Sequence, residues 1–140
     1  MRRFTTVLTV LLGIFPLTFG SWFLFSGHGA AAGFGIDPWP TGVAAGYFGV
    51  KGIRDIVTGL NILALFALGQ RRATGVLMAI STLIPITDMI MVLSHGGTAA
   101  TALGVHGLTA LVMLVDVSLL LRERRTVEAV EAPQPVGAHS

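Results

Sequence analysis

The sequence predicts an all-α fold, an up-down bundle of four transmembrane helices with the N and C termini in the cytoplasm. Three observations carry this prediction. Of the 140 residues, 53% are hydrophobic and only 11% are charged, against roughly 25% charged residues in a soluble domain. Four apolar stretches reach the length of about 20 residues that a helix needs to cross a bilayer. The basic residues gather in short clusters between these stretches, as expected for a multi-pass protein of the cell membrane.

One transmembrane domain is predicted over residues 1–125, followed by a cytoplasmic tail at 126–140. The first span begins like a signal peptide, but its apolar run continues to about residue 26, beyond the roughly 7–15 residues of a signal sequence. It is therefore predicted to be retained. The tail contains two prolines and no long apolar run, so it is expected to be disordered. The four spans are predicted at about 5–26, 43–69, 73–94 and 101–121.

The distribution of basic residues predicts the orientation of these spans. Seven of the nine Lys and Arg residues fall before the first span, between the second and third, and after the fourth. The connections at 27–42 and 95–100 contain neither. Because short cytoplasmic loops carry the excess of positive charge, both termini and the 70–72 turn are assigned to the cytoplasm. The sequence pI of about 9.9 reflects these clusters, and no nucleic-acid partner is predicted.

The second span contains the segment GYFGVKGIRDIVTGLN, which places Lys51, Arg54 and Asp55 inside a predicted membrane helix. Thr58 and Asn61 continue the polar side chains at helical spacing. An isolated charge at the centre of such a helix costs roughly 2.5–3.5 kcal/mol. These side chains are therefore expected to face the bundle interior, with Lys51 free to extend outward.

Two further ionisable side chains are expected at similar depth on the other spans, Asp88 on the third and His106 on the fourth. Pro85 is expected to kink the third span close to Asp88. Convergence of these groups predicts an ionisable pocket in the outer half of the bundle. The predicted catalytic residues are Asp55, Asp88 and His106, and the predicted ligand-binding residues are Lys51, Arg54, Thr58 and Asn61.

Within this pocket, Asp55 is expected to be the ionised carboxylate because it adjoins Arg54, and Asp88 is expected to donate a proton. Arg54 would hold the substrate or stabilise developing negative charge. The alternative is structural, with Arg54 paired to Asp88 and Lys51 to Asp55 between helices. Buried ion pairs are weak stabilisers, so the sequence favours a functional pocket. Asp116, near the inner end of the fourth span, is expected to be structural and neutralised by Arg122 or Arg72.

No metal and no cofactor are predicted. The chain has no cysteine, which excludes disulfides, thiolate ligands and thiol redox chemistry. His95 and His106 are eleven residues apart and belong to no metal-binding motif.

Three classes of function fit the pocket. The first is an enzyme or binding protein for a lipophilic small molecule, with metal-independent isomerisation, cyclisation or epoxide opening as suitable reactions. The second is an accessory subunit of a membrane redox or transport complex, with purely structural ion pairs. The third is a transporter, which would need a homo-oligomer formed through the glycine-rich second span. Membrane lipid is the surrounding partner in each case.

The segment from about 43 to 94 resembles a domain-of-unknown-function family of small four-helix membrane proteins related to the DoxX-like group. The resemblance is carried by GYFGVKGIRDIVTGLNIL and by GVLMAISTLIPITDMIMVLSHG. Its core is Gly49, Gly52, Arg54 and Asp55, joined to Asp88 on the next helix. The resemblance implies the four-helix topology and, through DoxX-like relatives, an association with quinone or redox complexes. It implies no particular activity.

Overall fold

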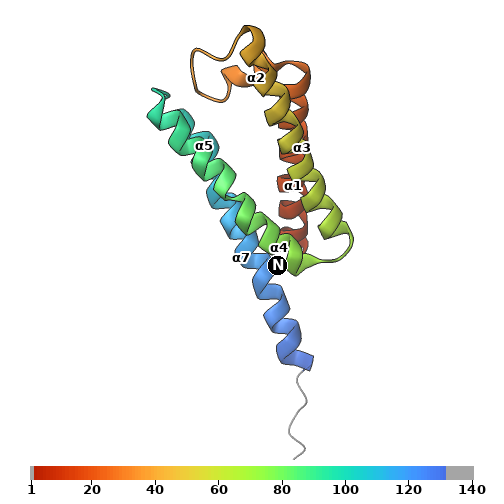
Figure 1. Cartoon of the computed structure of the whole chain (residues 1–140). Coiled ribbons are helices and arrows are strands. Elements are labelled where there is room, and N and C mark those ends of the chain that lie inside the picture. The colour runs from red at the N-terminus through yellow and green to blue at the C-terminus, as the bar shows by residue number, and fades with distance from the viewer. Residues whose placement is uncertain (1, 132–140) are drawn as a thin grey trace, which may run out of the picture.

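The computed structural model describes the backbone of residues 2–131 and the side chains of residues 2–123. Within this range the chain is an all-helical bundle without β-strands (Figure 1). The long helices are α1 (Arg2–Phe25), α3 (Gly46–Ala67), α4 (Arg71–Ser81), α5 (Leu83–Ser94) and α7 (Leu108–Glu131). Shorter elements join them: α2 (Gly27–Ala32), η1 (Gly42–Ala45), α6 (Ala99–Thr101) and η2 (Ala102–Gly107).

The helices pack as two pairs. One pair is α1 with α3, and the other sets α4 and α5 against η2 and α7. Figure 1 shows the two pairs diverging away from α4. This divergence separates α3 from α5, and no substantial contact joins these two helices.

Glycines bring α1 and α3 into backbone contact. A Cβ placed on Gly20 would lie 2.5 Å from the Gly52 carbonyl oxygen, and one on Gly59 would lie 2.5 Å from the Gly13 oxygen. Small residues permit such close crossings in membrane bundles. Gly52 and Gly59 of the second span are therefore used within the chain, and Gly46 and Gly49 remain open. An oligomer through this span stays a prediction.

The third and fourth spans are each built from more than one segment. The helix axis is interrupted at Thr82, between α4 and α5, three residues before Pro85. Proline removes an N–H from the helical ladder, which accounts for this break. The predicted kink itself stays a prediction. The fourth span is continuous from α6 to α7, with η2 wound as a π-helix. It continues to Glu131, six residues into the predicted tail, and residues 132–140 of that tail lie outside the described residues.

Three of these helical stretches are long and apolar enough to cross a membrane: Arg2–Phe25, Arg71–Ser94 and Ala99–Glu123. The helix α3 has 22 residues, but Lys51, Arg54 and Asp55 make it more polar than the other three. The three stretches indicate a membrane protein. The four-span topology needs α3 as well and remains a prediction.

The connections gather at two opposite ends of the bundle. Figure 1 shows the start of α1, the α3–α4 turn and the C-terminal part of α7 at one end, which we call the basic end. The connection that contains α2 and the connection between α5 and α6 lie at the other, which we call the loop end. The three basic clusters thus lie at one end of the bundle, and their assignment to the cytoplasm stays a prediction.

Aromatic side chains close the loop end. The helix α2 folds back so that Ala30 and Ala31 bury with Phe23 of α1. The rings packed around this cluster are Phe19, Phe34, Trp39 and Phe48. This layer fixes the backbone of Phe34 above the space between the two helix pairs.

Candidate functional site

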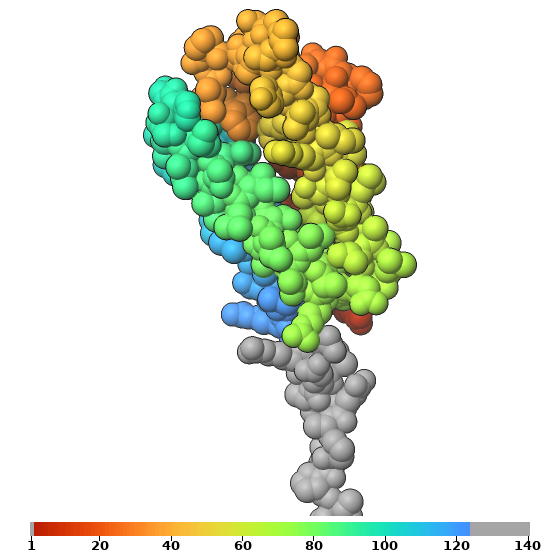
Figure 2. Space-filling model, viewed as in Figure 1, coloured from red at the N-terminus to blue at the C-terminus, as the bar shows by residue number. Residues whose placement is uncertain are grey.

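A cavity of about 360 Å³ lies between the two helix pairs. We call it the inner cavity. Four ionisable side chains line it, Lys51 and Asp55 from α3, Asp88 from α5 and His106 from η2. The rest of its wall is mostly apolar and includes Leu12, Phe15, Phe19, Ile62 and Met113. In Figure 2 the surface is hollowed between α3 and α5, and atoms of α1 are visible behind.

Lys51 is the centre of the polar cluster. Its Nζ lies 3.2 Å from Asp55 Oδ2 on the same helix and 3.8 Å from Asp88 Oδ2 on α5. The ammonium also lies 5.3 Å and 5.0 Å from the ring centroids of Phe23 and Phe34, within the range of cation–π attraction. Two carboxylates and two aromatic rings thus surround the Lys51 ammonium, and the expectation that Lys51 can extend outward stays a prediction.

Arg54 does not pair with Asp88. Its side chain is exposed and makes no ion pair within the described residues. Successive residues of a helix are turned by about 100°, so Lys51, Asp55 and Thr58 share the cavity face while Arg54 lies to one side. Asn61 follows Arg54 at seven residues and is exposed with it. The polar side chains predicted to form one stripe on α3 therefore lie on two adjacent faces of the helix. Asn61 lines neither the inner cavity nor the second cavity that Arg54 lines.

Thr58 is half-buried and lines the inner cavity, as predicted. Its hydroxyl donates to the Arg54 carbonyl oxygen at 2.8 Å. The hydroxyl proton is therefore occupied, and the oxygen can still accept a hydrogen bond from a bound molecule.

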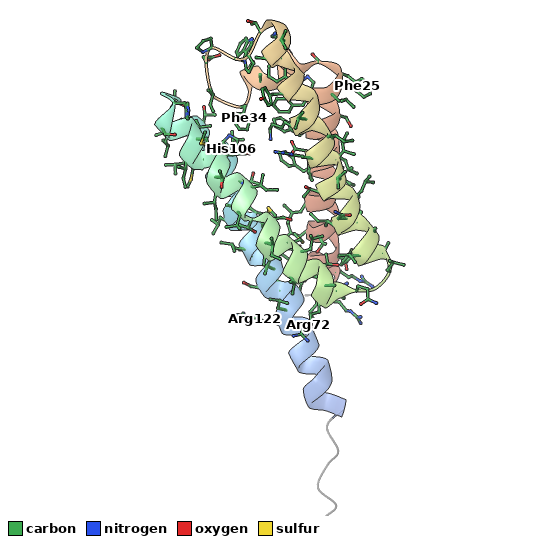
Figure 3. All side chains as sticks on the ribbon, viewed as in Figure 1. Phe25, Phe34, Arg72, His106 and Arg122 are labelled. Carbon is green, nitrogen blue, oxygen red and sulfur yellow. The ribbon has the colours of Figure 1, made fainter. Side chains whose placement is uncertain are left out.

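His106 joins the loop end to Asp88. Its Nε2 lies 3.0 Å from the Phe34 carbonyl oxygen, and its ring packs edge-on against the Phe34 ring at 4.8 Å (Figure 3). Its Nδ1 lies 4.0 Å from Asp88 Oδ2. His106 belongs to the π-helical η2, and such local widening of a helix is frequent at functional sites.

The contacts of His106 fix the roles of its two ring nitrogens. A carbonyl oxygen only accepts, so Nε2 must donate to Phe34. Nδ1 then faces the Asp88 carboxylate at 4.0 Å, a distance longer than a hydrogen bond. Both groups lie at the wall of the same mostly apolar cavity.

Asp116 lies apart from this cluster. It is fully buried, and Thr9 Oγ1 donates to its Oδ2 at 2.7 Å, which joins α1 to α7. Arg71 and Glu123 are charged side chains that act on it electrostatically, and the expected neutralisation by Arg122 or Arg72 stays a prediction. Arg71 Nε in turn lies 2.9 Å from Glu123 Oε2.

The Asp116 contact gives a first testable prediction. Asp116→Asn is expected to lose less thermal stability than Thr9→Val. Its amide oxygen can accept the same hydrogen bond from Thr9 and it carries no charge, although its NH2 group takes the place of Oδ1, which has no partner. Thr9→Val leaves a buried carboxylate oxygen without a donor and should cost about 1–3 kcal/mol. Thermal unfolding in neutral detergent measures both variants. A larger loss in Asp116→Asn than in Thr9→Val would contradict this assignment.

Sequence reasoning missed the aromatic contacts of the site. Phe23 and Phe34 face Lys51, and the Phe34 carbonyl accepts from His106. Phe34 lies in a loop rich in glycine and proline, GFGIDPWP. This loop has no hydrophobic periodicity from which the contacts of Phe34 could be predicted. The glycines on either side of Phe34 were the one visible signal of an unusual backbone path.

Among the described residues no group of three or more His, Asp or Glu side chains is placed to hold a metal ion. The predicted absence of a metal and of a cofactor remains a prediction.

The fold and the site define a class: an all-helical bundle with membrane-length apolar helices and a cluster of ionisable side chains at one end of an apolar cavity. A family model, the domain of unknown function DUF4267, matches residues 13–121. The chain belongs to this family, and the predicted membership of a domain-of-unknown-function family is confirmed. No curated protein and no solved structure matches the chain.

Proposed function

We propose that this chain is a four-span protein of the cell membrane that binds a lipophilic small molecule in the inner cavity. The single observation that carries the proposal is the composition of that cavity, in which Lys51, Asp55, Asp88 and His106 gather at one end of an apolar wall. Its volume of about 360 Å³ falls in the range of small-molecule sites, which combine an apolar lining with a few polar groups.

The chemistry available to a bound molecule is acid–base chemistry. The Asp88–His106 pair would supply or take up a proton, and Asp55, 3.2 Å from the Lys51 ammonium, would face developing positive charge. A metal-independent isomerisation, cyclisation or epoxide opening needs no more than such a pair. Asp88 and His106 are the proposed catalytic residues, and Asp55 acts beside them with Lys51 and Thr58 as ligand contacts.

A cavity-filling substitution tests the proposal. Thr109 lines the inner cavity from α7, and Thr109→Phe is expected to abolish retention of a co-purified lipophilic molecule, as read by native mass spectrometry. Ser118→Phe is the matched control, because Ser118 is exposed on the same helix and lies outside the cavity lining. Equal retention of the same molecule by both variants would contradict the proposal.

Cysteine labelling tests the proposed orientation of the helices in the membrane. The chain contains no cysteine, so single cysteines can be introduced at Ala32 in α2 and at Gln70 in the α3–α4 turn, both of them exposed. In intact cells a membrane-impermeant maleimide is expected to label the Ala32→Cys variant and not the Gln70→Cys variant. The reverse pattern would show that the proposed orientation is inverted. Labelling of both variants would show that α3 does not cross the membrane.

The main alternative is an accessory subunit of a membrane redox or transport complex, in keeping with the predicted relation to the DoxX-like group. Its supporting observation is that Lys51 already pairs with Asp55 and Asp88, as purely structural ion pairs would. In that case Thr109→Phe would weaken assembly of the complex no more than Ser118→Phe does.

A further inference from the structure

Arg54 has no partner among the charged side chains in the described part of the chain. Lys51 pairs with both Asp55 and Asp88, and Asp88 also lies 4.0 Å from His106. Arg54 makes neither an ion pair nor a side-chain hydrogen bond within residues 2–123. A lone guanidinium in a membrane helix is unfavourable, so a negative group from outside the chain would be bound favourably there.

Arg54 lines a second cavity of about 500 Å³, which we call the outer cavity. Trp39 and Tyr47 form part of its wall, and such aromatic side chains are typical of the level of lipid head groups. The outer and inner cavities share Lys51, Asp55 and Asp88 in their walls. They therefore adjoin at the Lys51–Asp88 pair, and an elongated molecule can occupy both.

The outer cavity has an apolar rim on the side of the bilayer. Val50 of α3 and Ile84 of α5 both line it and both are exposed. The helix α3 packs on α1 and α4 rather than on α5, which leaves the hollow seen between α3 and α5 in Figure 2. A molecule dissolved in the membrane can reach the cavity by this route without crossing a polar surface.

We propose that the occupant is an anionic amphiphile, whose carboxylate or phosphate head group binds Arg54 while its apolar chain extends past Lys51 into the inner cavity. This inference rests on the proposed function and adds the chemical class of the ligand. The planar guanidinium matches carboxylate and phosphate with two parallel hydrogen bonds. The inner wall of Leu12, Phe15, Ile62 and Met113 suits the chain.

The two tryptophans of the sequence provide the test, because Trp22 lines the inner cavity and Trp39 the outer one. A Trp39→Phe background leaves Trp22 as the reporter. The probes are 9,10-dibromostearic acid, whose bromine atoms quench tryptophan, and its uncharged methyl ester, both added to the full chain in neutral detergent. The acid is expected to quench Trp22 saturably, in a manner that excess unbrominated stearate reverses.

Substitution of Arg54 then separates head-group recognition from simple partitioning. Arg54→Gln should weaken binding of the acid at least about tenfold, the usual effect of losing a charged hydrogen bond, and should leave the ester unchanged. Arg54→Lys keeps the charge without the paired hydrogen bonds and should give an intermediate loss. Arg72→Gln is the control, since Arg72 is exposed at the opposite end of the bundle (Figure 3).

The outcomes distinguish this inference from the proposed function. Reversal of quenching by stearate alone identifies a single-chain acid as the ligand, and reversal by phosphatidylglycerol identifies a phospholipid; both support an anionic amphiphile. Equal binding of acid and ester, or no effect of Arg54→Gln, overturns the head-group assignment while the cavity still binds lipophiles. Absence of any saturable quenching by either probe overturns the proposed function itself.

Discussion

Replacing Gly20 by leucine is expected to prevent the protein from reaching its folded state. A Cβ at this position would lie 2.5 Å from the Gly52 carbonyl oxygen and 2.9 Å from both the Ile56 nitrogen and the Asp55 Cβ. Two of these three atoms belong to the backbone of α3 and cannot turn away, so the helices must separate. Overpacking of a core costs about 1–3 kcal/mol even where side chains can adjust, and a larger cost is expected here.

The measurement is the fraction of protein that elutes as a single species from a sizing column in neutral detergent, before and after a heating series. Gly49→Leu is the matched control, because a Cβ on Gly49 meets nothing within 4 Å. It should behave like the parent protein. If Gly20→Leu were as heat-resistant as Gly49→Leu, the close crossing of α1 and α3 would be incorrect.

Lys51→Met is expected to have the second largest effect, on both stability and binding. It leaves Asp55 and Asp88 facing each other without the ammonium that lies between them. Removing one partner of a fully buried pair costs about 3–5 kcal/mol. Lys51 and Asp88 keep 27% and 23% of their side-chain surface exposed. Because solvent screens such a pair, the expected loss of stability is lower, about 1–3 kcal/mol.

A double-mutant cycle isolates the contact that joins the two helix pairs. Lys51→Met combined with Asp88→Asn should be less destabilising than the sum of the two single changes, because the second change removes the charge that the first leaves unpaired. The same cycle with Arg54→Met and Asp88→Asn should be additive, since Arg54 has no ion pair with Asp88. Additivity in the first cycle together with coupling in the second would reverse the roles of Lys51 and Arg54.

Hydropathy and charge clusters predicted the helices well because a bilayer imposes strong constraints on length and composition. The predicted spans differ from the observed helices mainly at their ends, as in α7, which continues to Glu131. The end of a helix beyond the apolar stretch depends on local propensity, and the tail residues Ala and Glu favour helix. The sequence therefore predicted the bundle better than its boundaries.

The prediction of the site was correct in part. The Lys51–Asp55 pair of the structural alternative is present, whereas Arg54 does not pair with Asp88 and Asn61 lines neither cavity. Asp55, Asp88 and His106 do come together, because depth along each helix can be counted from the sequence. The partner of Asp88 could not be obtained in this way, since it depends on the rotation of α3 about its axis. That rotation is set by Gly52 and Gly59 packing on α1, which turns Lys51 inward and leaves Arg54 at the side.

Photolabelling of the folded protein shows directly whether the inner cavity binds a lipophilic molecule. A diazirine-bearing long-chain alcohol is a lipophilic probe without charge, and mass spectrometry maps the residues to which it attaches. We expect a saturable component on residues of the inner cavity, such as Phe19, Ile84 and Met113, which Thr109→Phe removes. Labelling confined to outward-facing side chains such as Val7 and Leu111, with no saturable component, would contradict it.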